Sequence, residues 1–286
     1  MMEDIDISFL ENKAKEIRRN IVDMIYHSGA GHIGGSLSST DILVTLYYKI
    51  MRIDPRNPVW TDRDRFILSK GHSVEGYYTI LADLGFIDRE ELKTYCKFNS
   101  RLTGHPTVKI PGVEANTGSL GHGLSLGVGM ALAGKMDKKD YKVYVLMGDG
   151  EQAEGSIWEA AMCARHYKLD NLIGIVDRNK LQIGGPTEYV MSLEDLSAKW
   201  ASFGWEVVEV NGHNISQLVT VFESVPVKYN KPTLILAHTV KGKGVSFIED
   251  KPEWHHKIPT PEEYTRMIRE LNQEDDNVRE DIGSAV

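Results

Sequence analysis

Hydrophobic residues in the middle of this chain fall into two short runs with a longer segment between them. Residues 143–147 (Val-Tyr-Val-Leu-Met) and residues 172–176 (Leu-Ile-Gly-Ile-Val) are apolar almost throughout, which is typical of buried parallel strands. Residues 157–166 have the composition of a helix, and Ser156 directly before them is a residue type that caps helices. The pattern therefore predicts a strand–helix–strand unit with parallel strands.

Strand and helix signals continue to alternate over the rest of the chain. Further strands are predicted at residues 65–69, 205–210 and 232–237. Further helices are predicted at residues 8–25, 39–50, 74–84, 88–98, 121–136, 193–203 and 215–222, and from Pro261 behind an N-cap at Thr260. Residues 28–35, 52–64 and 99–123 have the composition of loops. The order predicts an α/β fold, namely a doubly wound, mostly parallel sheet with helices on both faces.

Length and composition describe an ordinary globular domain. The chain has 286 residues, of which 41% are hydrophobic and 26% are charged, and this is ample for a sizeable core. It shows no internal repeat or low-complexity linker, so we expect a single domain over residues 1–286, with a loose acidic tail after about residue 272. Cys96 and Cys163 are too few and too far apart in sequence for a disulfide framework.

Charge and hydropathy exclude several kinds of partner. The formal net charge of −8 argues against a general nucleic-acid binder, although it is compatible with a local cationic pocket. No run approaches the about 20 apolar residues of a membrane span. The acidic N-terminal segment lacks the basic start and apolar core of a signal peptide. We therefore expect a cytoplasmic protein with neither a membrane nor a nucleic-acid partner.

Polar residues follow both central strands. Gly148-Asp149-Gly150 ends the first strand, and Asn179 comes just after the second. If the strands are neighbours, Asp149 and Asn179 lie side by side at the carboxyl edge of the sheet, where open α/β sheets bind ligands. Hard oxygen donors beside a helix N-terminus suit Mg²⁺ or Ca²⁺ carrying a diphosphate. A Gly-Asp-Gly tripeptide alone is usually only a turn, so the spacing to Asn179 carries the prediction.

Histidines form the second candidate group. His32, His72, His105 and His255 fall in predicted loops, most of them after strands or in glycine-rich turns. Any one of them alone is more often a surface residue than a catalyst, but several are predicted at one edge of the sheet. They lack the short-range pairing of a zinc site. Proton transfer near neutral pH and recognition of sugar hydroxyls are better uses for such residues.

The spacing of the motifs resembles that of thiamine diphosphate (ThDP) enzymes, and further segments resemble transketolase. Gly-Asp-Gly followed by a helix, a strand and, about thirty residues later, an asparagine is similar to the ThDP motif. The segments that resemble transketolase are GAGHIGGSLSS, RFILSKGH, TGHP, TGSLGHGLSLGVGMA, MGDGEQAEGSIWEAA, YKLDNL, DRNKLQIGG, HTVKGKG and WHH. They extend over nearly the whole chain and are similar to the diphosphate-binding half of that enzyme.

The resemblance implies roles for individual residues. A divalent cation, Mg²⁺ with Ca²⁺ or Mn²⁺ as alternatives, would be held by Asp149, Asn179 and the backbone carbonyl of Leu181. Residues at the cofactor would be His72, Gly118, Ser119, Leu120, Gly150, Glu154, Lys241 and His255, with Glu154 at the contact with a partner domain. Sugar hydroxyls and protons would be handled by His32, His105 and His255. The family often has Gly-Pro-Leu-Gly where this chain has Gly118-Ser119-Leu120-Gly121, which leaves the detail of the ring contact open.

The resemblance also implies a missing half. Transketolase chains are considerably longer, and their second half carries a pyrimidine-binding domain, whose glutamate activates the cofactor, and a third domain. Residues 1–286 show no second sheet region for these domains. We therefore expect the N-terminal subunit of a split transketolase, inert alone and completed by a C-terminal subunit in a heterotetramer of two of each chain. The complex would transfer a two-carbon ketol unit from a ketose phosphate to an aldose phosphate.

Other interpretations of the sequence stay open. A fragment of a deoxyxylulose-phosphate synthase or the alpha subunit of a 2-oxo acid dehydrogenase would share the Gly-Asp-Gly and asparagine motif. The histidine-containing segments favour transketolase, because a sugar acceptor needs hydroxyl-binding groups that a 2-oxo acid does not. A split transketolase specialised for an unusual sugar phosphate is a further possibility. A different class altogether is a non-catalytic, ThDP-binding regulatory subunit.

Overall fold

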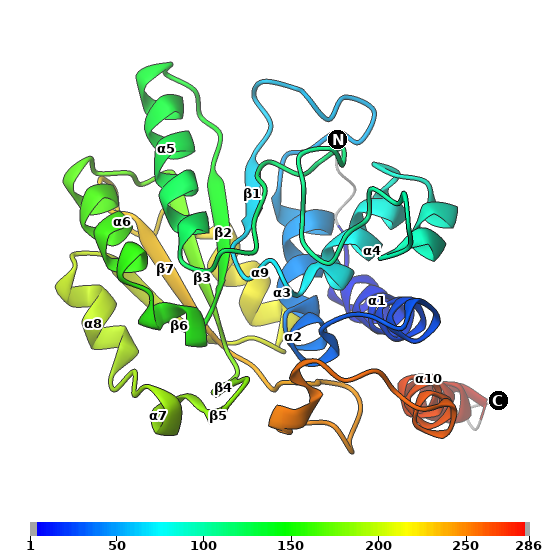
Figure 1. The fold of residues 1–286 in the computed structure, drawn as a ribbon. Helices are drawn as coiled ribbons and strands as arrows, with labels where there is room; N and C mark the ends of the chain where they lie inside the picture. The colour runs from blue at the N-terminus through cyan, green and yellow to red at the C-terminus, as the bar shows by residue number, and fades with distance from the viewer. Residues whose placement is uncertain (1–4, 284–286) are drawn as a thin grey trace.

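The central feature of the fold is one parallel β-sheet (Figure 1). The computed structural model describes the backbone of residues 5–283 and the side chains of residues 5–272. In this part of the chain, five strands pair in the order β1-β2-β3-β7-β6, and every pair is parallel. The strands are β1 Arg65–Leu68, β2 Val143–Gly148, β3 Leu172–Arg178, β6 Glu206–Asn211 and β7 Thr233–His238. The predicted parallel sheet, including the pairing of the two central strands, is confirmed.

Helices cover both faces of the sheet because the strands bury side chains on both sides. In β2, Tyr144 and Leu146 belong to one hydrophobic cluster, whereas Val143, Val145 and Met147 belong to the other. The first cluster is completed by α1 Ile7–Ser28, α2 Ile33–Ser38, α3 Thr40–Thr45, the π-helix η1 Leu46–Ile50, α4 Val74–Leu84, α9 Ile215–Glu223 and α10 Pro261–Gly283. The second is completed by α5 His122–Met136, α6 Gly155–His166 and α8 Leu196–Ser202 (Figure 1). Burial on both faces explains why the strands β2, β3 and β7 are largely apolar, whereas the edge strand β6 is only partly buried and contains two glutamates.

Short elements gather beyond the carboxyl ends of the strands. They are η3 Gly150–Ala153 after β2, the antiparallel hairpin of β4 Leu181–Gln182 and β5 Gly185–Pro186, α7 Thr187–Val190 after this hairpin, and η4 Pro252–His255 in the segment after β7. The sequence does not predict them, because elements this short show no hydrophobic period.

Some predicted elements differ from the observed ones at their ends. The predicted loop 28–35 contains the start of α2, because Ile33 turns into the core and is fully buried. Residues 88–98 form a shorter 3₁₀-helix, η2 Arg89–Thr94, which the Asp88 side chain caps. The remaining long loop between η2 and α5 is irregular, as predicted.

Two of the predicted helix caps have opposite outcomes. The Thr260 hydroxyl accepts a hydrogen bond from the Glu263 amide at 3.2 Å, so the cap of α10 is confirmed. The cap at Ser156 is wrong: α6 begins at Gly155, and the Ser156 hydroxyl donates to the Gly121 carbonyl at 3.0 Å. The Ser156 hydroxyl thus bonds to a backbone carbonyl of another loop instead of to the backbone amides at the start of its own helix.

Two expectations concern membranes and the end of the chain. Over the described residues, no helix is both long and apolar enough to cross a lipid bilayer. The backbone of α10 continues to Gly283, past residue 272. The expected looseness of this tail stays a prediction, because a helix end can fray.

Candidate cofactor site

A cavity of about 520 Å³ lies at the carboxyl edge of the sheet. The sequence-predicted residues that line it are His32, His72, Gly118, Leu120, Asp149, Gly150, Glu154, Asn179, Leu181, Lys241 and His255. Two predicted residues lie outside this lining. Ser119 is exposed, and the His105 ring lies beside the cavity with its centroid 6.5 Å from that of His32. The structure therefore gathers most of the predicted site in one place.

Asp149 and Asn179 lie close together because β2 and β3 are neighbours. Asp149 Oδ2 accepts a hydrogen bond from the Lys180 amide at 2.5 Å, and Lys180 stands between Asn179 and Leu181. Asn179 Oδ1 accepts a hydrogen bond from the Leu181 amide at 3.1 Å. Asn179 and Leu181 thus belong to one tight turn. Asp149, the third residue predicted to hold the cation, is hydrogen-bonded to that turn.

The donor set fits a cation that arrives with a diphosphate. The Asp149 carboxylate is buried, and burial together with the nearby Asp177 raises its pKa above the ordinary value. Arg178 Nη1 lies 3.2 Å from Asp149 Oδ2. A carboxylate, an amide oxygen and a backbone carbonyl suit Mg²⁺ when phosphate oxygens complete the coordination. Among the described side chains, no group of three or more His, Cys, Asp or Glu could hold a metal ion unaided.

A buried ion pair that the sequence analysis did not predict contacts the Asn179 side chain. Lys70, which follows β1, pairs with Asp177 at the end of β3, and both side chains are at most 2% exposed. Asp177 Oδ2 also accepts hydrogen bonds from the Ser38 hydroxyl at 2.6 Å and from Asn179 Nδ2 at 3.3 Å. Burial opposes ionisation of Asp177, but Lys70 together with hydrogen bonds from the Ser38 and Thr239 hydroxyls outweighs it, so the pKa of this carboxyl lies below its ordinary value. The position of both residues at strand ends was the signal that could have revealed them.

Glu151 is a second buried acid that the sequence did not single out. Its Oε1 accepts hydrogen bonds from the Ser69 hydroxyl and from the Gly121 amide, the latter at 2.8 Å. Its Oε2 accepts a hydrogen bond from the Gly148 amide at 2.9 Å. The Glu151 carboxylate therefore links two loops. One is the loop of residues 118–121, which holds the predicted contacts with the cofactor rings, and the other is the Gly-Asp-Gly turn. This is a structural link between two loops that lie far apart in sequence.

Histidine rings cluster at one end of the cavity. The His32 ring centroid lies 5.2 Å from that of His72 and 5.6 Å from that of His255. The centroids of His72 and His255 are 5.1 Å apart. His256, which sequence reasoning did not assign a role, has its ring centroid 4.5 Å from that of His32. The cluster brings together residues from separate segments of the chain.

The His32 and His255 rings are neutral near pH 7. Burial, followed by His256 and His105, lowers the pKa of His32 to about 4. Burial and the neighbouring Lys241 lower the pKa of His255 to about 3. Burial also lowers the pKa of His72 and that of His105. A neutral imidazole can both donate and accept a hydrogen bond, which suits contacts with hydroxyl groups.

Lys241 joins the oxygen donors to the histidines. Its ammonium group donates to the Leu181 carbonyl at 3.2 Å and lies 3.0 Å from His255 Nδ1. Burial and the nearby Lys70 lower the pKa of Lys241 to about 8. The side chain is therefore mostly charged at pH 7, and it brings a cation to a cavity that contains the Asp149 carboxylate.

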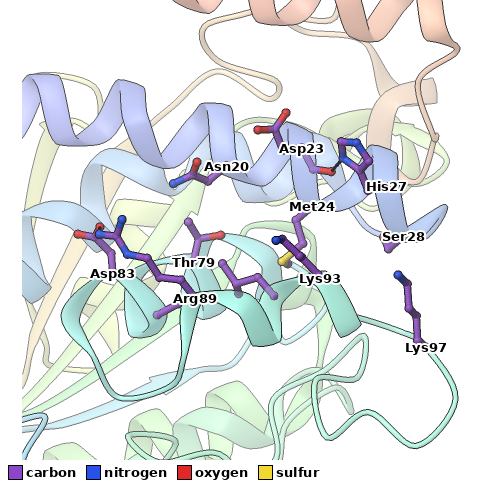
Figure 2. Close-up of a pocket in the computed structure, with 12 residues that line it drawn as sticks. Asn20, Asp23, Met24, His27, Ser28, Thr79, Asp83, Arg89, Lys93 and Lys97 are labelled. Atoms are coloured by element: carbon purple, nitrogen blue, oxygen red, sulfur yellow. Dashed lines mark hydrogen bonds and ion pairs between the residues drawn. The ribbon is translucent and has the colours of Figure 1, made fainter.

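A second cavity of about 540 Å³ lies elsewhere, between α1, α4 and η2 (Figure 2). Figure 2 shows Asp23 and His27 of α1 on one side and Arg89 and Lys93 on the other. The guanidinium of Arg89 pairs with Asp83, and Lys93 pairs with Glu90 at 2.5 Å. None of the sequence-predicted site residues lines this cavity. We therefore place the candidate site at the carboxyl edge of the sheet.

An open parallel sheet whose carboxyl edge presents oxygen donors, a buried lysine and histidines is typical of α/β enzymes that bind a ligand at this edge. Residues 10–278 match the family described as "Transketolase, thiamine diphosphate binding domain". The chain belongs to this family. The predicted transketolase membership, the α/β fold and the ThDP-binding domain are thereby confirmed.

Curated relatives of similar length are named as transketolase subunits. The chain is 52% identical over 269 residues to an apulose-4-phosphate transketolase subunit of Phocaeicola vulgatus, and this match covers 94% of the chain and 96% of the relative. It is 43% identical over 266 residues to "6-deoxy-6-sulfo-D-fructose transketolase subunit SqwG" of Clostridium sp., covering 93% of the chain and 97% of the relative.

Single-chain transketolases are much longer than this chain. The chain is 39% identical over 263 residues to human transketolase, and this match covers 91% of the chain but only 41% of the human protein. The crystal structure of transketolase from Campylobacter jejuni superposes with a TM-score of 0.88 at 33% identity, covering 94% of the chain and 43% of that structure. The chain therefore spans about two fifths of the length of single-chain transketolases.

Proposed function

We propose that this chain is the ThDP-binding subunit of a two-chain transketolase, which transfers a two-carbon ketol unit from a ketose phosphate to an aldose phosphate. The observation that carries the proposal is that Asp149, Asn179 and Leu181 line the same cavity as His32, His72 and His255. A diphosphate needs the first group and a polyhydroxylated substrate needs the second. Their presence in one cavity supports a sugar-converting enzyme.

The residues around the donors have distinct tasks in this proposal. Asp149, Asn179 and the Leu181 carbonyl hold Mg²⁺, for which Ca²⁺ or Mn²⁺ could substitute. The cation and Lys241 neutralise the diphosphate. Bound ThDP supplies the nucleophilic carbon for cleavage and formation of a carbon–carbon bond. The remaining cofactor contacts are His72, Gly118, Ser119, Leu120, Gly150, Glu154 and His255.

The histidines bind the sugar and move its protons. His32 Nδ1 is buried without a hydrogen-bond partner, and a buried polar atom of this kind is costly unless a ligand satisfies it. We assign this atom to a hydroxyl of the substrate. His105 and His255 flank it and exchange protons with the reacting carbonyl and hydroxyl groups.

A second polypeptide completes the site. We propose that it carries the pyrimidine-binding domain, meets this chain near Glu154, and forms a heterotetramer of two of each chain. The names of the relatives of equal length support a two-chain enzyme. We propose that residues 1–286 form one domain. Over the described residues, both hydrophobic clusters pack on the same sheet, which supports this proposal. The cytoplasmic location stays a prediction.

The substrate has a narrower candidate. Relatives of the same length are named for apulose 4-phosphate and for 6-deoxy-6-sulfo-D-fructose, rather than for common sugar phosphates. The relative named for apulose 4-phosphate is more than half identical to this chain. We therefore propose apulose 4-phosphate as the first donor to assay, with fructose 6-phosphate as the common alternative.

The experiment is a test of assembly and turnover. The untagged chain is purified from its own source in Mg²⁺ and ThDP and measured by native mass spectrometry, and ketol transfer by the isolated complex is assayed. The expected result is a complex with a second polypeptide that binds ThDP and transfers the two-carbon unit. Turnover by the chain alone would contradict the split enzyme, and a complete complex that binds ThDP without turnover would indicate a regulatory role.

Binding by a variant tests the proposed donors directly. Asp149→Ala removes the only carboxylate among them, so Mg²⁺-dependent ThDP binding should be lost in isothermal titration calorimetry of the complex. Asp62→Ala is the control, because Asp62 is a partly exposed carboxylate paired with Lys139 at 2.6 Å. Equal ThDP affinity of the two variants would refute the assigned site.

A further inference from the structure

Helix α4 begins directly after Ser73 and carries a buried acid close to the histidine cluster. The Glu75 side chain is 0% exposed. Its Oε1 accepts hydrogen bonds from the His32 amide and the Tyr95 hydroxyl, both at 2.8 Å. Its Oε2 accepts a hydrogen bond from the Ser36 hydroxyl at 2.6 Å. A buried carboxylate needs such donors, and in the described part of the chain Glu75 has no cationic partner.

The backbone before His32 is shaped to this carboxylate. Gly31 has a φ of +141°, and a Cβ at this position would lie 2.5 Å from Glu75 Oε1 and 2.6 Å from Ile25 Cγ1. Only glycine lets the chain pass so close to the carboxylate. The His32 amide therefore reaches Glu75 through a contact that leaves no room for a side chain.

The same face of α4 also holds the segment that carries His105. The Tyr78 hydroxyl donates to the His105 carbonyl at 2.9 Å, and the Thr103 hydroxyl donates to the same atom at 3.0 Å. Glu75 and Tyr78 are three residues apart, so they lie on one side of the helix. One helical face thus binds the main chain of two histidines from different loops.

We propose that Glu75 and Tyr78 are positioning residues that fix the main chains of His32 and His105, and thereby the separation of their rings at the end of the cavity. The inference rests on the proposed function in so far as these rings bind the sugar. Neither residue touches the substrate in this proposal. They act by holding the main chain at His32 and at His105, two residues that do not belong to the sheet.

Four variants of the two-chain complex test the proposal. Glu75→Leu removes both acceptors at similar volume, and Glu75→Gln keeps an oxygen for the His32 amide. Tyr78→Phe removes one of the two hydroxyl donors to the His105 carbonyl, and the one that comes from α4. Tyr77→Phe is the matched control, because the neighbouring Tyr77 hydroxyl donates to the Gly112 carbonyl at 2.7 Å, seven positions after His105, and not to the main chain of either histidine.

Hydrogen exchange by mass spectrometry is the first readout, and it needs no activity. Glu75→Leu should speed exchange in residues 30–36 by about tenfold or more, since a lost hydrogen bond of about 1.4 kcal/mol corresponds to a factor of ten. Glu75→Gln should restore exchange to near the wild-type rate. Tyr78→Phe should speed exchange around residues 103–107, whereas Tyr77→Phe should leave both segments unchanged. Unchanged exchange in Glu75→Leu and Tyr78→Phe would overturn the proposal.

Steady-state kinetics are the second readout. Glu75→Leu and Tyr78→Phe should raise KM for the sugar phosphate more than they lower kcat, with ThDP affinity unchanged. If Glu75→Leu does not fold, Tyr78→Phe decides. Equal effects of Tyr78→Phe and Tyr77→Phe on KM would refute the positioning role. A wild-type complex that transfers no ketol unit would refute the proposed function, while the exchange rates would still decide whether α4 anchors the two loops.

Discussion

The ammonium group of Lys241 lies between the Leu181 carbonyl, at 3.2 Å, and His255 Nδ1, at 3.0 Å. A carbonyl oxygen and an unprotonated ring nitrogen are both acceptors, so a single cation satisfies both. His255 must then carry its proton on Nε2. Lys241 thus sets the tautomer of a histidine and adds the positive charge that a diphosphate needs.

Loss of this cation should weaken cofactor binding. Lys241→Met keeps most of the volume but removes the charge, and we expect ThDP affinity to fall by about tenfold or more, because a charge-assisted contact contributes about 1.5–3 kcal/mol. Calorimetric titration of the complex with ThDP in Mg²⁺ measures this. Lys199→Met in α8, outside the cavity lining, is the control. A Lys241→Met complex with wild-type affinity would remove Lys241 from the site.

The buried histidines should make the protein sensitive to acid. The pKa of His32 is lowered to about 4 and that of His255 to about 3, from an ordinary value of 6.5. Below pH 6.5 the unfolded chain takes up protons that the folded chain cannot accept, so stability is full above pH 6.5 and falls as the pH drops toward the folded values. The measurement is the urea midpoint between pH 4 and pH 7.

Substitution should flatten this dependence. The double variant His32→Gln and His255→Gln should lose less stability between pH 6.5 and pH 4 than the wild type, because two of the groups that take up protons on unfolding are gone. His166→Gln, at the end of α6, removes a histidine outside the cluster and should follow the wild-type curve. A double variant with the wild-type slope would show that other groups cause the acid sensitivity.

The Lys70–Asp177 pair should show strong energetic coupling. Lys70→Met leaves the Asp177 carboxylate buried without its cation, which costs about 3–5 kcal/mol of unfolding free energy. Asp177→Asn likewise leaves the Lys70 ammonium group buried without its anionic partner. The double variant removes both charges and keeps an amide for the neighbouring hydroxyls. It should therefore lose at least about 1 kcal/mol less than the sum of the single losses.

Urea unfolding of the four proteins in this cycle gives the coupling energy. The matched control is the cycle of Lys139→Met and Asp62→Asn. Both side chains of this pair are more than a third exposed, and exposed ion pairs contribute little to the free energy of unfolding. Additive losses in the Lys70–Asp177 cycle would contradict a coupled buried pair.

Two glycines of α5 should respond to alanine in opposite directions. A Cβ on Gly127 would lie 2.5 Å from Val145 Cγ2 of β2, whereas a Cβ on Gly129 would have no atom within 4 Å. Gly129→Ala should stabilise the protein by about 0.5–1 kcal/mol, because alanine is the better helix former. Gly127→Ala should destabilise it, because overpacking costs about 1–3 kcal/mol and outweighs that gain. Thermal unfolding of both variants measures the difference, and a stabilised Gly127→Ala would show that β2 and α5 can move apart.

Local patterns in the sequence determined the sheet and its ligand edge. The central strands β2 and β3 are buried on both faces, so their sequences are apolar runs, and the helix between them requires parallel pairing. These patterns alone place Asp149 after β2 and Asn179 after β3. The resemblance of segments such as SKGH and DRNK to transketolase then indicated the family, because residues that bind one cofactor recur at fixed places along the fold.

Only the tertiary structure decided how the site is held together. Lys70 and Asp177 are 107 positions apart, and His32 and Glu75 are 43 apart, so no local period connects them. The cap predicted at Ser156 was wrong for the same reason, because the Ser156 hydroxyl donates a hydrogen bond to the Gly121 carbonyl on a distant loop. A residue type shows which bonds a side chain can form, but burial and packing choose the partner among groups that are remote in the chain.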